Sequence, residues 1–181
     1  MLEDPESFWV PNRGGACTAA SVLAALGLLG LKSLPELGAV TLALGARDAY
    51  GPPGLLDYFG LPRRRARLDR RIEALAGAQG LAIRSRTRPA LPGLPVRPAK
   101  DELLVANLAW GQEKPGLYGT WGWNILRPQT YSTGGHSVLL IAVEGRQWLV
   151  LDPNHPGLQR WPRPGLAVTL TRIHRLLDRA A

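Results

Sequence analysis

The sequence predicts an α+β fold, with helix-forming segments in the first part of the chain and strand-forming segments in the second. Residues 1–87 hold mainly alanine- and leucine-rich or amphipathic segments, whereas residues 99–181 hold short apolar and β-branched runs. Between them, residues 88–98 contain four prolines and are expected to form a loop. Because helices and strands are segregated, we expect helices packed on an antiparallel sheet, not βαβ units. A chain of 181 residues suits one domain with a hydrophobic core, so we expect a single domain over 1–181.

The first predicted helix covers residues 17–30, which are rich in alanine and leucine and contain no proline. The segment is apolar on nearly every side, so we expect this helix to be buried. Gly14 and Gly15 allow the backbone to turn sharply before the helix, and Gly30 can end it.

Three further helices are expected. Ser33 can cap a second helix over 33–44, with Glu36 three residues later as in a capping box. A short helix is expected near 55–59. Residues 63–78 form an amphipathic pattern, with apolar residues on one stripe and arginines elsewhere.

The predicted strands are short and apolar or β-branched. They cover residues 81–85, 103–109, 137–143, 147–151 and 166–173. Glu144, Gly145 and Arg146 provide a hairpin turn between two of them. We expect residues 111–133, which include Trp121 and Trp123, to form a long loop over a surface or cleft.

The cysteine count, the length of the apolar runs and the first residues exclude several classes of protein. A single cysteine excludes an intramolecular disulfide, and no apolar run is long enough to suggest a membrane span. The first residues lack a basic region followed by an apolar core, so a cytoplasmic protein without a membrane partner is expected. The chain has one cysteine and three histidines without metal-ligand spacing, so we expect no metal. It contains no nucleotide-binding motif, so we expect no cofactor.

The net charge is +8, from 22 Lys and Arg against 14 Asp and Glu. The chain is also rich in alanine, leucine, glycine and proline, and such a compositional bias can raise the arginine content without selection for binding. We therefore do not expect nucleic acid as a partner. The arginine run of the helix at 63–71 is either a solvated face or, through Arg63, Arg64 and Arg67, a surface for an anionic partner.

Cys17 stands where the glycine turn meets the start of the first helix. The partial positive charge and unpaired N–H groups of a helix N-terminus lower the pKa of a thiol and favour the reactive thiolate. The alternative is that Cys17 is only a small buried hydrophobic residue.

His136 and Asp152 lie at the outer ends of two strands joined by the hairpin turn. Two antiparallel strands of this length bring those ends side by side, so the carboxylate can accept the imidazole N–H and fix its tautomer. The alternatives are that His136 is a surface loop residue and that Asp152, followed by Pro153 and Asn154, only forms a turn.

A cysteine at a helix start, a histidine at a strand start and an aspartate at the end of the next strand, in this order, resemble the papain-like cysteine peptidases. The chain is most similar to the bacterial C39 and C39-like peptidases. The segments 12–20, 135–143 and 149–153 carry the resemblance. The resemblance implies a papain-like fold, a Cys17–His136 thiolate–imidazolium pair oriented by Asp152, and hydrolysis of a peptide or amide bond without a cofactor.

The chain departs from this family at the oxyanion donor, for which the family uses a glutamine a few residues before the cysteine. Here the nearest side-chain amide is that of Asn12. Asn154 is a second candidate for orienting the histidine, and His155 can support the site. Trp121 and Trp123 form either a substrate wall or part of a small core.

Other functions stay open. The missing glutamine suggests a non-catalytic papain-fold protein that binds a peptide or partner. Residues 13–17 and 148–152 resemble stretches of the arylamine acetyltransferases, another Cys-His-Asp group, which keeps acyl transfer as a lesser alternative. The remaining alternative function is that of a basic protein associated with nucleic acid.

Overall fold

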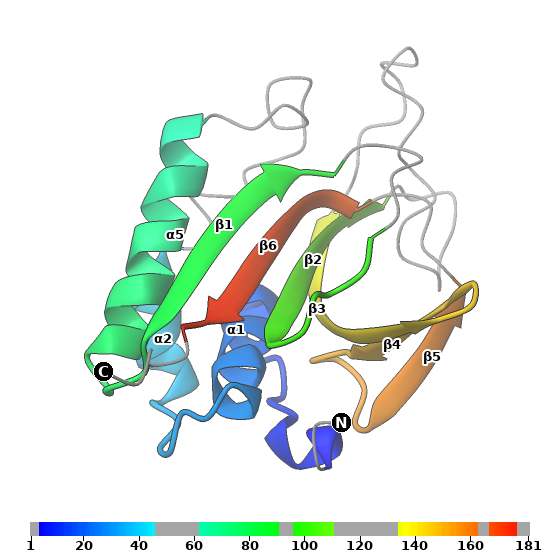
Figure 1. Ribbon diagram of the computed structural model, residues 1–181, viewed down its shortest axis with the longest axis horizontal. Coiled ribbons are helices and arrows are strands. Elements are labelled where there is room, and N and C mark those ends of the chain that lie inside the picture. The colour runs from blue at the N-terminus through cyan, green and yellow to red at the C-terminus, as the bar shows by residue number, and fades with distance from the viewer. Residues whose placement is uncertain (1–3, 46–61, 91–95, 111–133, 163–166, 177–181) are drawn as a thin grey trace.

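The computed structural model describes residues 4–45, 62–90, 96–110, 134–162 and 167–176, which form helices on one face of a sheet (Figure 1). The helices are η1 (Pro5–Phe8, a 3-10 helix), α1 (Cys17–Leu28), α2 (Leu37–Leu44) and α5 (Pro62–Gly77). The strands are β1 (Ile83–Pro89), β2 (Glu102–Trp110), β3 (Gly134–Glu144), β4 (Gln147–Leu151), β5 (Leu158–Pro162) and β6 (Ala167–Arg175).

The six strands form one sheet in the order β1-β6-β2-β3-β4-β5, and every neighbouring pair is antiparallel. The predicted α+β class is therefore confirmed. The strand β1, which comes from the first half of the chain, pairs with β6 from the end of the chain.

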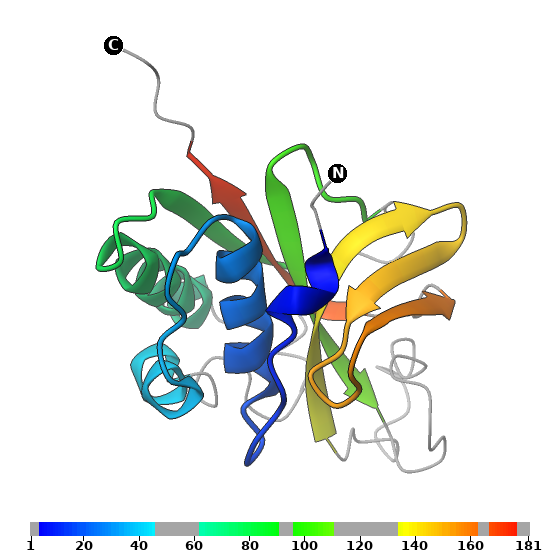
Figure 2. The same cartoon turned by 90° about the horizontal axis from the view of Figure 1, so that it is seen from below.

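The main core lies between the helices and the sheet, on the face where α1, α2 and α5 gather (Figure 2). From Thr18 to Leu28 every residue of α1 is buried, as its uniformly apolar sequence predicts. Gly27 permits a close approach to η1, because a Cβ atom there would lie 2.5 Å from Phe8 Cδ1. A second apolar cluster, which includes Leu104, Leu140 and Trp148, lies on the opposite face of the sheet.

The glycine positions agree with the expected turns. Gly14 and Gly15 have φ values of 61° and 80°, and Gly30, at 105°, follows the end of α1. The N–H groups of Gly30 and Leu31 bond the carbonyls of Gly27 and Leu26, which are the two bonds of a Schellman motif.

The predicted start of the second helix is wrong. The helix α2 begins at Leu37, with Glu36 at its N-cap and no side-chain cap bond, so Ser33 does not cap it. Pro35 disfavours the helical conformation at Leu34, the residue before it, so a helix cannot run through from Ser33. Glu36, with φ −61° and ψ 136°, is still extended, and the helix begins after it.

The strands differ from the prediction most at two places, and the other strand ends lie within three residues of those predicted. The strand β1 runs to Pro89, so the loop predicted for 88–98 begins later, because Arg88 and Pro89 still pair with Leu170 and Thr169 of β6. The edge strand β5 was not predicted, since its five residues carry no long apolar or β-branched run. The helix expected near 55–59 lies outside the described residues.

The free edge of β1 is capped by carboxylates of α5. The N–H groups of Ser85 and Thr87 donate to Glu73 Oε1 at 2.8 Å and to Asp69 Oδ2 at 2.9 Å. The hydroxyls of Ser85 and Thr87 both donate to Asp69 Oδ1. Main-chain donors that would otherwise attract a further strand are thus occupied by side chains of this chain.

Within the described segments, no helix combines the length and the apolar composition that crossing a membrane requires.

Candidate active site

Cys17 begins α1 directly after the turn at Gly14 and Gly15. The N-cap residue, Ala16, makes no side-chain cap bond, so no side chain of the N-cap competes for the first N–H groups of the helix. The thiol is half-buried, whereas the next residue, Thr18, is buried. This N-terminus therefore presents a sulfur atom and helix N–H groups at the same place.

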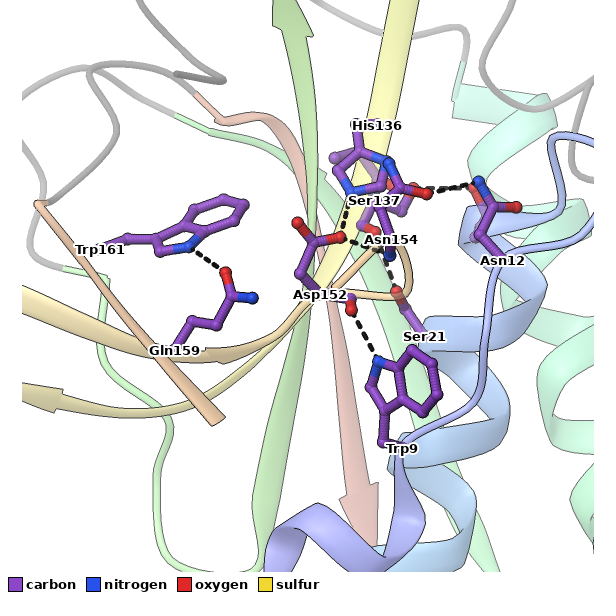
Figure 3. Close-up of polar contacts among 11 residues, drawn as sticks. Trp9, Asn12, Ser21, His136, Ser137, Asp152, Asn154, Gln159 and Trp161 are labelled. Carbon is purple, nitrogen blue, oxygen red and sulfur yellow. Dashed lines mark hydrogen bonds and ion pairs between the residues drawn. The ribbon is translucent and has the colours of Figure 1, made fainter. Parts of the chain in front are cut away.

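His136 and Asp152 meet as the hairpin geometry requires (Figure 3). His136, near the start of β3, places Nε2 2.7 Å from Asp152 Oδ1, immediately after β4. Both side chains are almost completely buried, at 2% and 0% exposure. Because Nε2 is engaged by the carboxylate, Nδ1 is the ring nitrogen left for another partner.

The carboxylate of Asp152 is held by the turn that follows it. The N–H of Asn154 donates to Oδ1 at 2.9 Å, and the indole of Trp9 donates to the main-chain carbonyl of Asp152 at 2.7 Å. The other carboxylate oxygen, Oδ2, is buried and accepts no hydrogen bond from the described residues. The N–H of His155 also bonds the Asp152 carbonyl, but the His155 side chain is exposed.

The electrostatics of the site favour opposite charges on Cys17 and His136. Burial raises the pKa of the Cys17 thiol, but a hydrogen bond to His136, the His136 charge and bonds from Ser137 outweigh it and lower the pKa. Burial lowers the pKa of His136, but hydrogen bonds with Asp152 and Cys17 and the charges of both raise it to about 9. The thiolate and the imidazolium therefore stabilise each other.

Ser137 is a site residue that the sequence reasoning missed. Its hydroxyl donates to Asn107 Oδ1 at 2.6 Å and lies 2.8 Å from Thr18 Oγ1. Since a serine hydroxyl has one hydrogen, and Asn107 takes it, the Thr18 hydroxyl must donate to Ser137. The Ser137 carbonyl accepts from Ser21 at 3.0 Å, so Ser137 joins the start of α1 to β3.

The sequence carried no signal for this role. Side chains alternate between the faces of a strand, so a His136 directed toward the helix with Cys17 predicts a Ser137 directed away from it. In the structure Ser137 nevertheless bonds Thr18 and Ser21 of that helix.

Asn12 belongs to the segment that leads to Cys17, and it is tied to the turn after Asp152. Its N–H donates to the carbonyl of Pro153 at 2.7 Å, and its Nδ2 donates to Asn154 Oδ1 at 2.8 Å. Its own Oδ1 is buried and accepts no bond within the described part of the chain. The structure thus places Asn12 beside Asn154, with one amide hydrogen committed to it.

No protein-family model matches the chain, and no curated protein is significantly similar to it in sequence. In structure, the chain is similar to a crystal structure from Bacillus anthracis described as that of a candidate C39-like peptidase. The TM-score is 0.45 and the identity 11%, over 91% of this chain and 92% of that chain. A likeness at this level says nothing about activity.

The remaining candidate residues from the sequence either lie outside the described part of the chain or are exposed on another element. Trp121 and Trp123 are outside the described residues. Arg63 and Arg64 belong to α5, but their side chains are also outside the described part, whereas Arg67 is exposed. In the segments that the structure describes, no group of three His, Cys, Asp or Glu side chains could hold a metal ion.

Proposed function

We propose that this chain is a papain-like cysteine hydrolase, similar to the C39-like peptidases, that cleaves a peptide or amide bond through Cys17, His136 and Asp152. The observation that supports the proposal is the buried His136–Asp152 hydrogen bond of 2.7 Å beside a thiol whose pKa is lowered by the same imidazole. A carboxylate that orients an imidazole next to a thiolate is the arrangement that nucleophilic acyl transfer requires.

The mechanism starts from the thiolate–imidazolium pair. Cys17 Sγ attacks the carbonyl carbon of the scissile bond, and the C–N bond breaks as His136 gives its proton to the leaving amine. Water then attacks the thioester while His136 takes one of its protons. The C–S bond breaks, a carboxylic acid leaves, and the thiolate and imidazolium are restored. Throughout, Asp152 holds Nε2, so that Nδ1 stays directed to the reacting atoms.

The oxyanion in this mechanism needs donors at the start of α1. The N–H of Cys17, in the first turn, is a main-chain donor for a charge that develops beside the sulfur. Asn12 is a side-chain candidate, and it can serve only with the amide hydrogen that does not bond Asn154. The peptide or protein substrate would lie across this helix N-terminus and the start of β3.

The test is the reactivity of Cys17 at a pH where free cysteine is mostly protonated. We expect iodoacetamide to alkylate Cys17 at about pH 6 at least ~10-fold faster than free cysteine, because only the thiolate reacts. His136→Gln should abolish the excess rate, and Arg146→Gln, at the exposed hairpin turn, is the matched control. An alkylation rate equal to that of free cysteine would refute the activated nucleophile.

Turnover is a separate measurement. The purified chain is incubated with an unfolded protein substrate, and new amino termini are counted against the Cys17→Ser variant. New termini that depend on Cys17 support hydrolysis. An activated thiol that produces none would favour the second candidate, a papain-fold protein that only binds a peptide.

One contact favours that second candidate: the Asn12 amide at the expected oxyanion position already donates to Asn154. If a thioester forms but amines rather than water resolve it, acyl transfer replaces hydrolysis. Added amine acceptors distinguish these outcomes through the product, because acyl transfer joins the amine to the acyl group as a new amide, whereas hydrolysis leaves a free carboxylate.

A further inference from the structure

A row of three arginines lies on the edge strand β1, away from the proposed active-site residues. Arg84, Arg86 and Arg88 are exposed and alternate with the buried Ile83, Ser85 and Thr87 of the same strand. We call Arg84, Arg86 and Arg88 the arginine row. Successive side chains on one face of a strand are about 7 Å apart, so the row is a regular line of positive charge.

The row lies on the face of the sheet opposite to the helices. Arg84, Arg86 and Arg88 pair with His174, Arg172 and Leu170 of β6, and Leu170 belongs to the apolar cluster on that outer face. In Figure 1, β1 runs along one margin of the sheet, with α5 beside it. The row is therefore separated by the sheet from the arginines of α5.

Neighbouring charges do not neutralise the row. Beside it on β6, Arg172 and His174 add positive or titratable groups, and Arg172 bonds Glu102 of β2 at 2.6 Å. Among the described positions of β1, β6 and β2 on this face, Glu102 is the one carboxylate, and Arg172 already engages it. The remaining positive charge needs an anionic partner or water.

The edge itself restricts what such a partner can be. A peptide usually adds to an edge strand through its main-chain groups. Here the outward N–H groups of Ser85 and Thr87 already donate to Glu73 and Asp69 of α5. A ligand must then bind through the arginine side chains alone, and a guanidinium group fits a phosphate with two parallel hydrogen bonds.

We propose that the arginine row binds the phosphate backbone of a single-stranded nucleic acid. A single line of guanidinium groups can follow one phosphodiester chain, and such contacts need no particular base sequence. The overall charge of the chain, +8, increases the attraction of a polyanion but does not select this surface. The regular placement of three uncompensated arginines on one strand face is what selects this surface.

The experiment measures binding of a fluorescein-labelled oligothymidylate of about 20 nucleotides by anisotropy across a range of salt concentrations. The row variant carries Arg84→Gln, Arg86→Gln and Arg88→Gln. The matched control carries Lys32→Gln, Arg70→Gln and Arg146→Gln, which are exposed elsewhere and change the net charge equally. Thermal melts establish that both triple variants are folded.

We expect the row variant to bind at least ~10-fold more weakly at about 50 mM salt, with a salt slope reduced by about 2, from three lost contacts at about 0.7 each. The control should keep both values. Replacing the row by lysines should keep the salt slope and weaken binding less, since charge is retained without the bidentate geometry.

Several results would overturn the proposal. They are equal weakening in the row and control variants, absence of binding by the unmodified chain, and tighter binding of a labelled poly-glutamate peptide of the same length. The last result would assign the row to an acidic protein partner. None of these measurements depends on Cys17, so the outcome is independent of the proposed hydrolase activity.

Discussion

Asp152→Asn separates the charge of the proposed orienting residue from its position. Asp152 Oδ1 accepts from both His136 Nε2 and the Asn154 N–H, whereas Oδ2 accepts nothing from the described residues. An asparagine can therefore keep its oxygen in the Oδ1 position, retain both bonds and remove the negative charge. Its amide nitrogen then takes the Oδ2 position, to which no described residue donates a hydrogen bond.

The magnitude follows from the pKa of His136, which rises from 6.5 to about 9 despite burial. At about 1.4 kcal/mol per unit, this shift represents about 3 kcal/mol in favour of the imidazolium. Asp152 contributes its hydrogen bond and its charge to that shift, and Cys17 contributes the rest. We expect the variant to lower the pKa of His136 by about one unit or more.

The assay is an NMR titration of the histidine Cε1–H signals, with His136→Gln used to assign the resonance. Glu144→Gln, which removes an exposed carboxylate that pairs with Arg160, is the matched control and should leave the midpoint unchanged. If the His136 midpoint stays near 9 in the Asp152→Asn variant, the carboxylate does not stabilise the imidazolium and the reasoning fails.

The same shift predicts how stability depends on pH. A histidine whose pKa is raised on folding adds stability that is fully present below its unfolded pKa of 6.5 and is lost as the pH rises through about 9. Asp152→Asn should therefore reduce the free energy of unfolding more at pH 6 than at pH 10, measured by urea denaturation. An equal loss at both pH values would contradict this prediction.

Three further predictions concern the surroundings of the site and the fold. Ser137→Ala should lower the free energy of unfolding by about 1–3 kcal/mol, because it leaves the buried Asn107 Oδ1 and the Thr18 hydroxyl without this partner; an unchanged urea midpoint contradicts it. Asp69→Ala should lower the free energy of unfolding by about 2–3 kcal/mol in urea, since it removes the acceptor of the Thr87 N–H and of the Ser85 and Thr87 hydroxyls. Arg70→Ala on the same helix should have little effect. Gly27→Ala should lower the free energy of unfolding by about 1–3 kcal/mol, because its Cβ would lie 2.5 Å from Phe8. A melting temperature equal to that of the unmodified chain would exclude this clash.

Much of the fold is readable from local sequence because it depends on local chemistry. The uniformly apolar segment after Cys17 is a buried helix, and positive-φ glycines surround it where sharp turns were expected. The strands β2, β3 and β4 carry dense apolar runs and were found. The edge strand β5 was missed, because such a strand needs little apolar sequence of its own and is defined by its pairing with β4.

The sequence alone determined the α+β class, the position of the cysteine at a helix start and the hairpin that carries His136 and Asp152, since each depends on residues close together in the chain. Only the tertiary structure decided that Trp9 and Asn12 are tied to the turn after Asp152, that Ser137 joins α1 to β3, and that α5 caps β1. These contacts join residues far apart in the chain, and polar side chains carry no periodic pattern that reveals their partners. They form because donors and acceptors removed from water must be satisfied wherever the packing of the core brings them together.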